Sequence, residues 1–224
     1  MIRLCVFDMD GLLLDSERQL YMKNAIEVST QLGKPISDFF LTTLMGGSWD
    51  NYLVRVEEEY GDYFSIDEYW KNFNERTQYT IENVAIPLRP GVKDMLDFCK
   101  KEGIHMAIAT STPYGNALSM IKNAGISEYI EFVITPDQVT KTKPDPEIFL
   151  KAIEHFNVPI NEAMVFEDGD NGARAAINGN CRLILVEDLA YLSAEDKKYA
   201  ELVLDNISPA IDYIKEENER TAGV

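Results

Sequence analysis

Short apolar runs alternate with amphipathic stretches through the second half of the chain, and this alternation restricts the fold more than any other feature of the sequence. Strands that alternate with helices join through right-handed βαβ units and form a parallel sheet with helices on both faces. A further apolar run, residues 2–8, supplies one more strand. The pattern therefore predicts an α/β fold with a Rossmann-like, doubly wound parallel sheet. We expect strands at residues 104–109, 132–135, 163–166, 182–186 and 202–204, and helices at 91–102, 113–124, 146–156, 172–179 and 208–217.

The segment between the first two strands is rich in polar residues and carries helical patterns with almost no strand signal. We expect helices near residues 49–60 and 65–83, and a capping box of Ser16 and Gln19 where the first helix begins. This pattern predicts a Rossmann-like core, residues 1–15 plus 86–224, and a small inserted helical-bundle cap domain, residues 16–85. The polar tail after Lys215 is expected to fray.

The charge and composition of the chain exclude several classes of partner. A formal charge of −17 over 224 residues leaves no basic stripe for a nucleic acid. No apolar run approaches the roughly 18 residues of a membrane span, and charged residues interrupt the N-terminal run, so we expect neither a membrane segment nor a signal peptide. The three cysteines fit no C-x-x-C pattern and indicate a reducing cytoplasm. No additional interface segment stands out, and we expect a monomer.

Polar side chains follow four of the predicted strands and should meet at one edge of the sheet, where open parallel sheets bind their ligands. They are Asp8 and Asp10 after the first strand, Thr110 after the second, Lys143 after the third, and Glu167 with Asp168 after the fourth. Two like charges 4 Å apart repel by about 4 kcal/mol at an effective dielectric constant near 20, so four carboxylates require protons or a cation. Oxygen ligands favour a hard ion, and Mg²⁺ is the usual one beside a phosphate.

These residue types can divide the steps of phosphoryl transfer among them. Asp8 would hold the metal and attack phosphorus, which gives an aspartyl phosphate. Asp10, two residues further on, would protonate the leaving oxygen and then deprotonate the hydrolytic water. Thr110 would hydrogen-bond a phosphoryl oxygen, and Lys143 would balance the charge of the nucleophile and the transferring group. A small phosphorylated metabolite is therefore the expected partner.

Four motifs of the chain resemble the ordered motifs of the haloacid dehalogenase superfamily of phosphotransferases. The motifs are FDMDGLLLDSE, IATST, KPDPEIF and VFEDGDNG, and the resemblance spans residues 2 to about 214. The helical insertion is similar to the small cap of the β-phosphoglucomutase-like subfamily. The resemblance implies that Asp8 is the nucleophile and Asp10 the acid/base. It also implies that Thr110 is the hydroxyl residue of the second motif and Lys143 the lysine of the third. It also implies that Mg²⁺ is bound by Asp8, the Asp10 main-chain carbonyl and Asp168, with Glu167 alongside.

The chain departs from the subfamily at three positions. Gly169 stands where the subfamily usually has serine after the acidic pair. Leu20 stands where the mutase has a cap histidine, and Trp49 stands at or near the position of the mutase's phosphate-binding arginine. Because a mutase must hold a second phosphate, these departures favour a phosphatase. We expect Gly46, Trp49 and Ser111 to contact the substrate, although Trp49 could equally pack in the cap core.

The sequence therefore favours a Mg²⁺-dependent phosphatase that hydrolyses a small phosphomonoester, a sugar phosphate being one candidate, through an aspartyl phosphate. A β-phosphoglucomutase-type isomerase is the alternative among enzymes. The third candidate is a non-catalytic phospho-acceptor resembling a receiver domain, which also uses an aspartate, a hydroxyl, a lysine and Mg²⁺. In a receiver the acceptor aspartate follows the third strand, and no aspartate ends that strand here.

Overall fold

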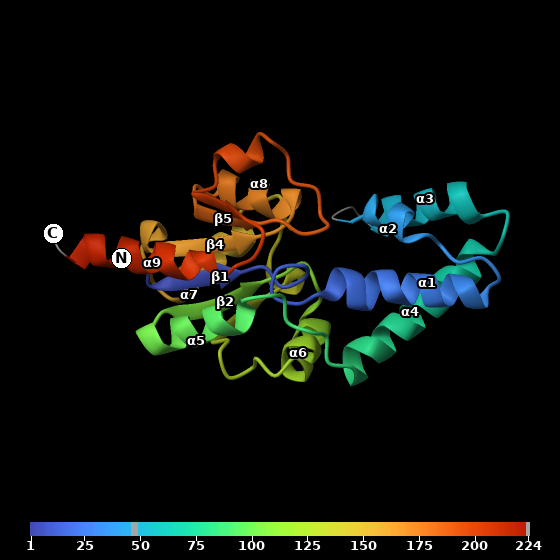
Figure 1. Ribbon diagram of the computed structural model, residues 1–224, viewed down its shortest axis with the longest axis horizontal. Helices are drawn as coiled ribbons and strands as arrows, with labels where there is room; N and C mark the ends of the chain where they lie inside the picture. Colours follow the sequence, from blue (N-terminus) through green and yellow to red (C-terminus); the bar gives the residue numbers. More distant parts are fainter. Residues whose placement is uncertain (46–48, 223–224) are drawn as a thin grey trace.

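The predicted parallel sheet is present in the computed structural model, which describes residues 1–45 and 49–222, with only the backbone of residues 49, 50 and 222. Within this part of the chain, six parallel strands form one sheet in the order β3-β2-β1-β4-β5-β6 (Figure 1). The order reverses direction beside β1, so the fold is the doubly wound α/β fold that the sequence predicts. The strands are β1 (Leu4–Phe7), β2 (His105–Ala109), β3 (Phe132–Ile134), β4 (Ala163–Glu167), β5 (Arg182–Val186) and β6 (Leu202–Leu204).

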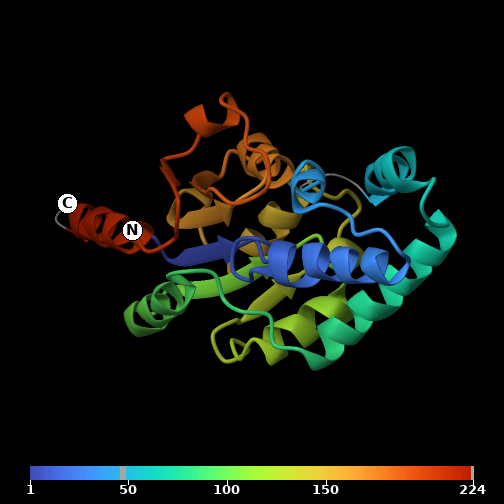
Figure 2. The same cartoon turned by 45° about the vertical axis from the view of Figure 1, so that its right-hand side comes forward.

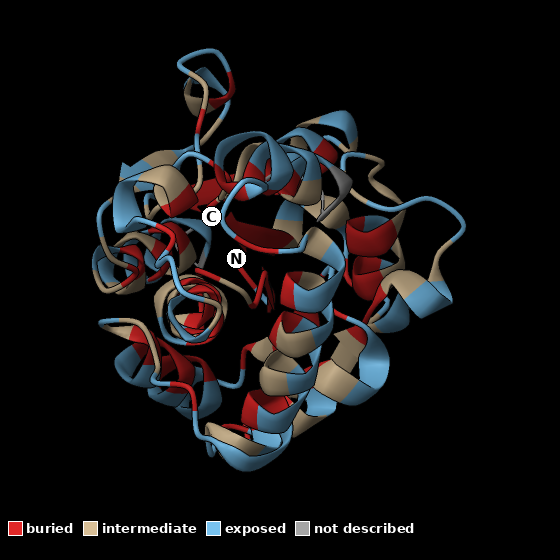
Figure 3. Cartoon of the chain, turned by 90° about the vertical axis from the view of Figure 1, so that its right-hand side faces the viewer, coloured by how far each residue is buried: buried red, intermediate tan, exposed pale blue. Residues whose placement is uncertain are grey.

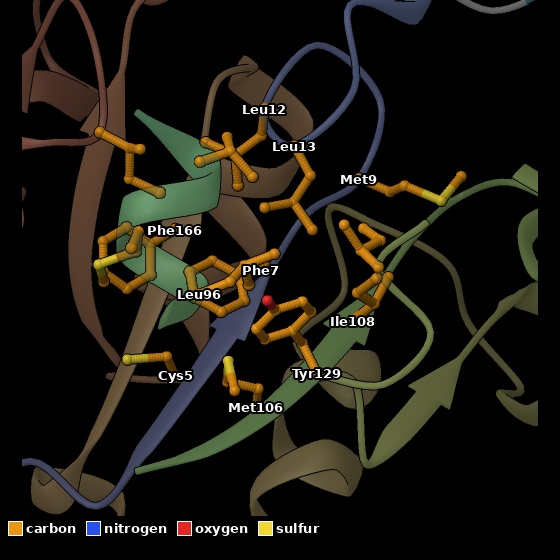
Figure 4. Close-up of a cluster of buried hydrophobic side chains, with 14 of the residues drawn as sticks. Cys5, Phe7, Met9, Leu12, Leu13, Leu96, Met106, Ile108, Tyr129 and Phe166 are labelled. Atoms are coloured by element: carbon orange, nitrogen blue, oxygen red, sulfur yellow. The ribbon is translucent and has the colours of Figure 1, made fainter. Parts of the chain in front are cut away.

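Helices cover both faces of the sheet, which is why every residue of β1 and β4 is buried. One hydrophobic cluster lies under α5 (Val92–Glu102), α6 (Tyr114–Asn123) and α9 (Pro209–Ala222), and Figure 4 shows Phe7, Leu96 and Phe166 within it. The rings of Phe7 and Phe166 stack with centroids 4.9 Å apart. A second cluster lies under α7 (Glu147–His155) and α8 (Asp170–Asn178) on the opposite face. Three short 3-10 helices, Pro136–Gln138, Ile160–Glu162 and Asp196–Lys198, lie in the connections.

The chain between β1 and α5 is helical and projects beyond the carboxyl ends of the strands (Figure 1). It has its own hydrophobic cluster, which includes Leu41, Val56, Tyr69 and Phe73. Buried residues lie on the inner faces of these helices and exposed residues on the outer faces (Figure 3). The helical character agrees with the sequence-based expectation, while the exact division at residues 16 and 85 stays a prediction. The elements are η1 (Glu17–Met22, a π-helix), α1 (Lys23–Gln31), α2 (Asp38–Thr42), α3 (Trp49–Tyr60) and α4 (Ile66–Asn83).

Two local predictions are wrong. Ser16 has helical dihedral angles (φ −72°, ψ −33°) and its side chain makes no capping hydrogen bond, so the expected capping box does not form. The C-terminal tail does not fray after Lys215, because α9 continues to Ala222. Glu217 is buried there and accepts a hydrogen bond from Arg182 at 2.7 Å, which attaches this end of the helix to β5.

The two chain crossings between the sheet and the helical insertion lie side by side. The Asp15 backbone N–H donates to Pro87 at 2.9 Å, and the Arg89 N–H donates to Leu13 at 2.9 Å. The buried carboxylate of Asp188, after β5, joins both crossings, because it lies 2.7 Å from Arg18 and 2.8 Å from Arg89. This network links the insertion to the sheet through charged groups. Among the helices described, none has the length and apolarity needed to cross a membrane.

Candidate active site

The register of the sheet brings the predicted site residues to one edge. Phe7 of β1 pairs with Ile108 of β2 and with Phe166 of β4. The residues that follow these positions therefore emerge together at the carboxyl ends of three adjacent strands. Asp8 follows β1 directly and Glu167 is the last residue of β4. The sheet thus places two buried carboxylates side by side.

Lys143 lies between these two carboxylates. Its Nζ is 2.5 Å from Asp8 Oδ1 and 2.6 Å from Glu167 Oε1, and it also donates to the Ala109 carbonyl at 2.9 Å. The three charged side chains are only 5%, 10% and 3% exposed, respectively. Burial opposes the lysine's charge, but the two carboxylates outweigh it and raise the pKa of Lys143. The two carboxylates therefore favour the charged form of Lys143 at the end of β1.

One lysine does not neutralise the carboxylates gathered at this edge. Carboxylate oxygens of Asp8, Glu167 and Asp168 all lie within 4.8 Å of one another and are buried. Burial, and then the charge of Asp8, raise the pKa of Asp168. Burial also raises the pKa of Glu167 to about 7, although Lys143 opposes the shift. Protons or a cation can balance this buried all-oxygen set, whose chemistry suits a hard divalent cation.

Two glycines allow these carboxylates to pack closely. A Cβ at Gly172, in the first turn of α8, would lie 1.8 Å from Glu167 Oε1. A Cβ at Gly11 would lie 2.2 Å from Asp168 Oδ2, and Gly11 has a φ of +81°, which favours glycine. By contrast, a Cβ at Gly169 would meet only the Ala190 Cβ, at an ordinary 3.6 Å. The cluster therefore depends on Gly11 and Gly172, while Gly169 leaves room for a side chain.

Asp10 is hydrogen-bonded to two hydroxyl groups. Thr112 Oγ1 donates to Asp10 Oδ2 at 2.6 Å, and Thr110 Oγ1 lies 3.3 Å from the same oxygen. Burial, and next the charge of Asp8, raise the pKa of Asp10, and the threonine hydroxyls partly oppose the shift. Asp10 Oδ1 is buried and has no hydrogen-bond partner among the described residues. One oxygen of Asp10 is thus held by hydroxyl groups, while the other has no hydrogen-bond partner among the described residues.

Thr110 differs in position from its expected role. The residue is fully buried, and its hydroxyl accepts the Thr112 backbone N–H at 3.0 Å besides facing Asp10. It is absent from the lining of the adjoining pocket among the described residues, whereas the predicted substrate contact Ser111 is part of that lining. Gly46 and the side chain of Trp49 lie outside the described residues.

A pocket of about 240 Å³ opens above Asp8 and Asp10. Its floor carries the catalytic candidates and Lys143, and its roof is formed by apolar and aromatic residues of the helical insertion, Leu41, Leu44, Met45 and Tyr52. Among the described lining residues, Lys143 is the only lysine or arginine. The pocket therefore has one cationic position, next to Asp8, under a largely apolar roof.

Sequence reasoning missed three residues that contribute to this pocket. Thr112 is the closest hydroxyl partner of Asp10, whereas the sequence pointed to Thr110, two residues earlier in the motif. Tyr21 and Glu17, both on η1, line the pocket, and burial raises the pKa of Glu17 to about 8. The signal for Glu17 was its position directly after Asp15-Ser16, where the chain leaves the sheet edge.

Comparison with known proteins defines the class of this chain. The model of the haloacid dehalogenase-like hydrolase family matches residues 5–186, so the chain belongs to that family. A phosphorylated carbohydrates phosphatase from Thermotoga maritima is 34% identical over 174 residues, which cover 76% of this chain and 78% of the relative. A phosphoglycolate phosphatase from Thiobacillus denitrificans is 28% identical, with 94% and 92% covered.

The solved structures agree with this assignment. A Thermotoga maritima protein provisionally named a β-phosphoglucomutase superposes with a TM-score of 0.80 at 28% identity. The superposition covers 96% of this chain and 99% of that one, so the likeness includes both the sheet and the helical insertion. The predicted membership of the haloacid dehalogenase superfamily is confirmed.

Proposed function

We propose that this protein is a Mg²⁺-dependent phosphatase that hydrolyses a small phosphomonoester through an aspartyl phosphate on Asp8. One observation carries the proposal: Asp8 is buried at the end of β1, 2.5 Å from the Lys143 ammonium, and lines a pocket large enough for a small metabolite. The phosphatase names of the relatives support the same activity. We also propose that the helical insertion acts as the cap of this site and that the protein is a monomer of the reducing cytoplasm.

The residues present fit a magnesium ion. The buried oxygens of Asp8 and Asp168 lie close enough together to share one cation, and Glu167 lies beside them. Burial and the neighbouring carboxylates raise the pKa of Asp168, so a cation at this position would favour its charged form. We propose Asp8, Asp168 and the Asp10 main-chain carbonyl as ligands, with Glu167 alongside. When bound, Mg²⁺ would neutralise the carboxylates and withdraw charge from the phosphoryl oxygens.

The chain's own residues then account for both half-reactions. An Asp8 oxygen forms a bond to phosphorus while the bond from phosphorus to the leaving oxygen breaks, and protonated Asp10 gives its proton to that oxygen. In the second half-reaction a water attacks phosphorus, Asp10 takes the water's proton, and the bond between Asp8 and phosphorus breaks. Lys143 holds Asp8 in position and offsets the negative charge of the transferring group. The hydrogen bond from Thr112 orients Asp10 for both steps.

A phosphatase fits the pocket better than a mutase does. A sugar mutase must bind a bisphosphate and therefore needs a second cationic position. Among the described lining residues, Lys143 is the only cation, and the roof contributes Leu41, Leu44 and Met45. A single phosphate with a modest organic group matches this lining, and a sugar phosphate is consistent with the carbohydrate phosphatase among the relatives.

A panel of phosphorylated sugars, nucleotides and carboxylic acids, assayed with Mg²⁺ for phosphate release, tests this function. Conversion of glucose 1-phosphate to glucose 6-phosphate should be measured in parallel. We expect hydrolysis of at least one phosphomonoester, its loss on chelation, and its loss in Asp8→Asn. Isomerisation that is much faster than hydrolysis would replace the phosphatase assignment with the mutase.

A further inference from the structure

A second cavity adjoins the pocket at Asp8. It has a volume of about 760 Å³ and lies between α4 of the helical insertion and the beginning of α6, which run beside each other (Figure 2). Tyr21, Ser111 and Thr112 line both cavities. Because Thr112 holds Asp10, the groove begins one side chain away from the proposed acid/base. A ligand with its phosphate at Asp8 could therefore extend into this groove.

The lining of the groove combines aromatic rings with uncharged hydrogen-bonding groups. The rings of Trp70 and Tyr79 lie on α4 together with the amides of Asn74 and Gln78, and Asn116 faces them from α6. Gln78 Nε2 donates to Glu82 at 2.7 Å and lies 3.4 Å from Asn116 Oδ1, so the amides are already ordered across the groove. Aromatic faces beside amide and carboxylate groups suit a ligand with apolar C–H faces and many hydroxyls.

The charge of the groove restricts the ligand further. Its ionisable groups at neutral pH are carboxylates, including Glu82, and no lysine or arginine belongs to the lining within the described residues. A phosphate or another anion would lie unpaired beside these carboxylates, which is unfavourable. A neutral polyhydroxylated group can instead donate its hydroxyls to the carboxylates and exchange hydrogen bonds with the amides.

We propose that this groove binds a neutral glycosyl group of an extended substrate whose phosphate lies at Asp8. The proposal deepens the phosphatase function and rests on it for the position of the phosphate. It names the substrate class as a phosphorylated sugar that carries a second sugar unit. The volume of the groove exceeds that of the pocket at Asp8, about 760 against 240 Å³, so the non-phosphorylated part has the larger space.

Binding and hydrolysis of two matched probes test the proposal. Glucose 6-phosphate and trehalose 6-phosphate share the phosphorylated glucose, and the second adds one neutral glucosyl unit. Calorimetry on the Asp8→Asn variant measures binding without turnover, and phosphate release by the unmodified enzyme measures kcat/KM. We expect about tenfold tighter binding and about tenfold higher kcat/KM for the disaccharide phosphate, the equivalent of one or two hydrogen bonds.

A pair of substitutions on α4 assigns the difference to the groove. Asn74→Leu removes an amide from the lining, whereas Asn72→Leu changes the same residue type two positions earlier, outside it. Asn74→Leu should abolish most of the disaccharide preference and leave glucose 6-phosphate within about twofold; Asn72→Leu should retain the preference. Equal affinities for both probes, or a preference insensitive to Asn74→Leu, would overturn the proposal. If the enzyme binds the disaccharide phosphate more tightly but hydrolyses no phosphomonoester, the proposed phosphatase activity is wrong and the proposed glycosyl-binding site is supported.

Discussion

The Lys143 ammonium lies 2.5 Å from Asp8 Oδ1 and 2.6 Å from Glu167 Oε1, with all three side chains almost fully buried. Within the described residues, Lys143 is the only lysine or arginine that pairs with these two carboxylates, and its removal would leave both without a cationic partner. We expect Lys143→Met to lower kcat/KM about a thousandfold, because Asp8 loses its position and the transferring group loses a positive charge. The variant should also unfold at lower temperature, since breaking a buried ion pair costs about 3 kcal/mol or more.

Lys141→Met is the matched control, because the Lys141 side chain is 73% exposed and, among the described residues, forms an ion pair only with Asp145, at 3.5 Å. This variant should keep both activity and thermal stability. Phosphate-release kinetics and differential scanning calorimetry check both variants. Near-normal activity in Lys143→Met would contradict the assigned role of the lysine.

Thr112 is predicted to orient the acid/base. Thr112→Val removes the 2.6 Å hydrogen bond to Asp10 Oδ2, whereas Thr112→Ser retains the hydroxyl. We expect the valine variant to lose about tenfold in kcat/KM with an alkyl phosphate, whose leaving oxygen needs a proton. With p-nitrophenyl phosphate, whose leaving group needs none, kcat/KM should change little. An equal loss with both substrates would indicate a general distortion of the site instead.

The fold and the convergence of the site could be predicted because they depend on periodic and local features. Parallel strands buried on both faces read as apolar runs, and residues at their carboxyl ends must meet at one edge. Asp8 and Glu167 follow from that rule. Lys143 lies in the connection after β3, outside any strand, so its place in the chain predicted the edge of the sheet but not its contact with both Asp8 and Glu167.

The remaining details could not be predicted because they depend on backbone geometry beyond the strand ends. Thr110 and Thr112 are both threonines of the second motif, and the sequence does not distinguish them. The backbone of the turn after β2 determines which hydroxyl lies nearer to Asp10. Serine is a residue type that often caps a helix, but Ser16 precedes a π-helix, η1, and its own backbone dihedral angles are helical, so its side chain does not cap. Gly172 has no visible role until the Glu167 carboxylate is seen to occupy the space of its missing Cβ.

The glycines beside the carboxylates give a steric prediction. Gly172→Ala places a Cβ 1.8 Å from Glu167 Oε1, so the carboxylate must move away from Lys143 and Asp168. We expect this variant to need at least about tenfold more Mg²⁺ for half-maximal activity, the size of effect seen when groups that support metal ligands are disturbed. Gly169→Ala should keep its Mg²⁺ requirement, because its Cβ has ordinary room. Titration of activity with Mg²⁺ compares the two, and identical curves would contradict the close packing described.

The stability of the metal-free protein should decrease as the pH rises. Burial raises the pKa of Glu167 to about 7 and of Glu17 to about 8, and also raises the pKa of Asp10 and of Asp168. In the unfolded chain these groups have pKa values near 4, so above about pH 5 the folded state binds more protons than the unfolded state. The contribution of these groups to the free energy of unfolding is therefore fully present at low pH and is lost as the pH rises through about 7 to 8.

Mg²⁺ should reverse this trend, because it binds the deprotonated carboxylates and stabilises the folded state that holds them. Thermal unfolding between pH 5 and 8, with chelator or with Mg²⁺, measures both effects. We expect Mg²⁺ to raise the Tm more at pH 8 than at pH 5, and Glu17→Gln to flatten the metal-free pH profile. A metal-free Tm that increases steadily from pH 5 to pH 8 would show that burial does not raise the pKa values of these carboxylates.

The Asp10→Ala variant provides a direct test of whether Asp8 carries the phosphoryl group. With p-nitrophenyl phosphate, phosphorylation of Asp8 needs no acid, but hydrolysis of the phosphoenzyme needs the base that this variant lacks. Mixing in a stopped-flow instrument should release a burst of p-nitrophenolate equal to the enzyme concentration, followed by slow turnover. Mass spectrometry after acid quenching should find one phosphoryl group on the peptide that contains Asp8, and none in Asp8→Asn. Turnover without a burst and without a phosphorylated Asp8 peptide would contradict the covalent mechanism.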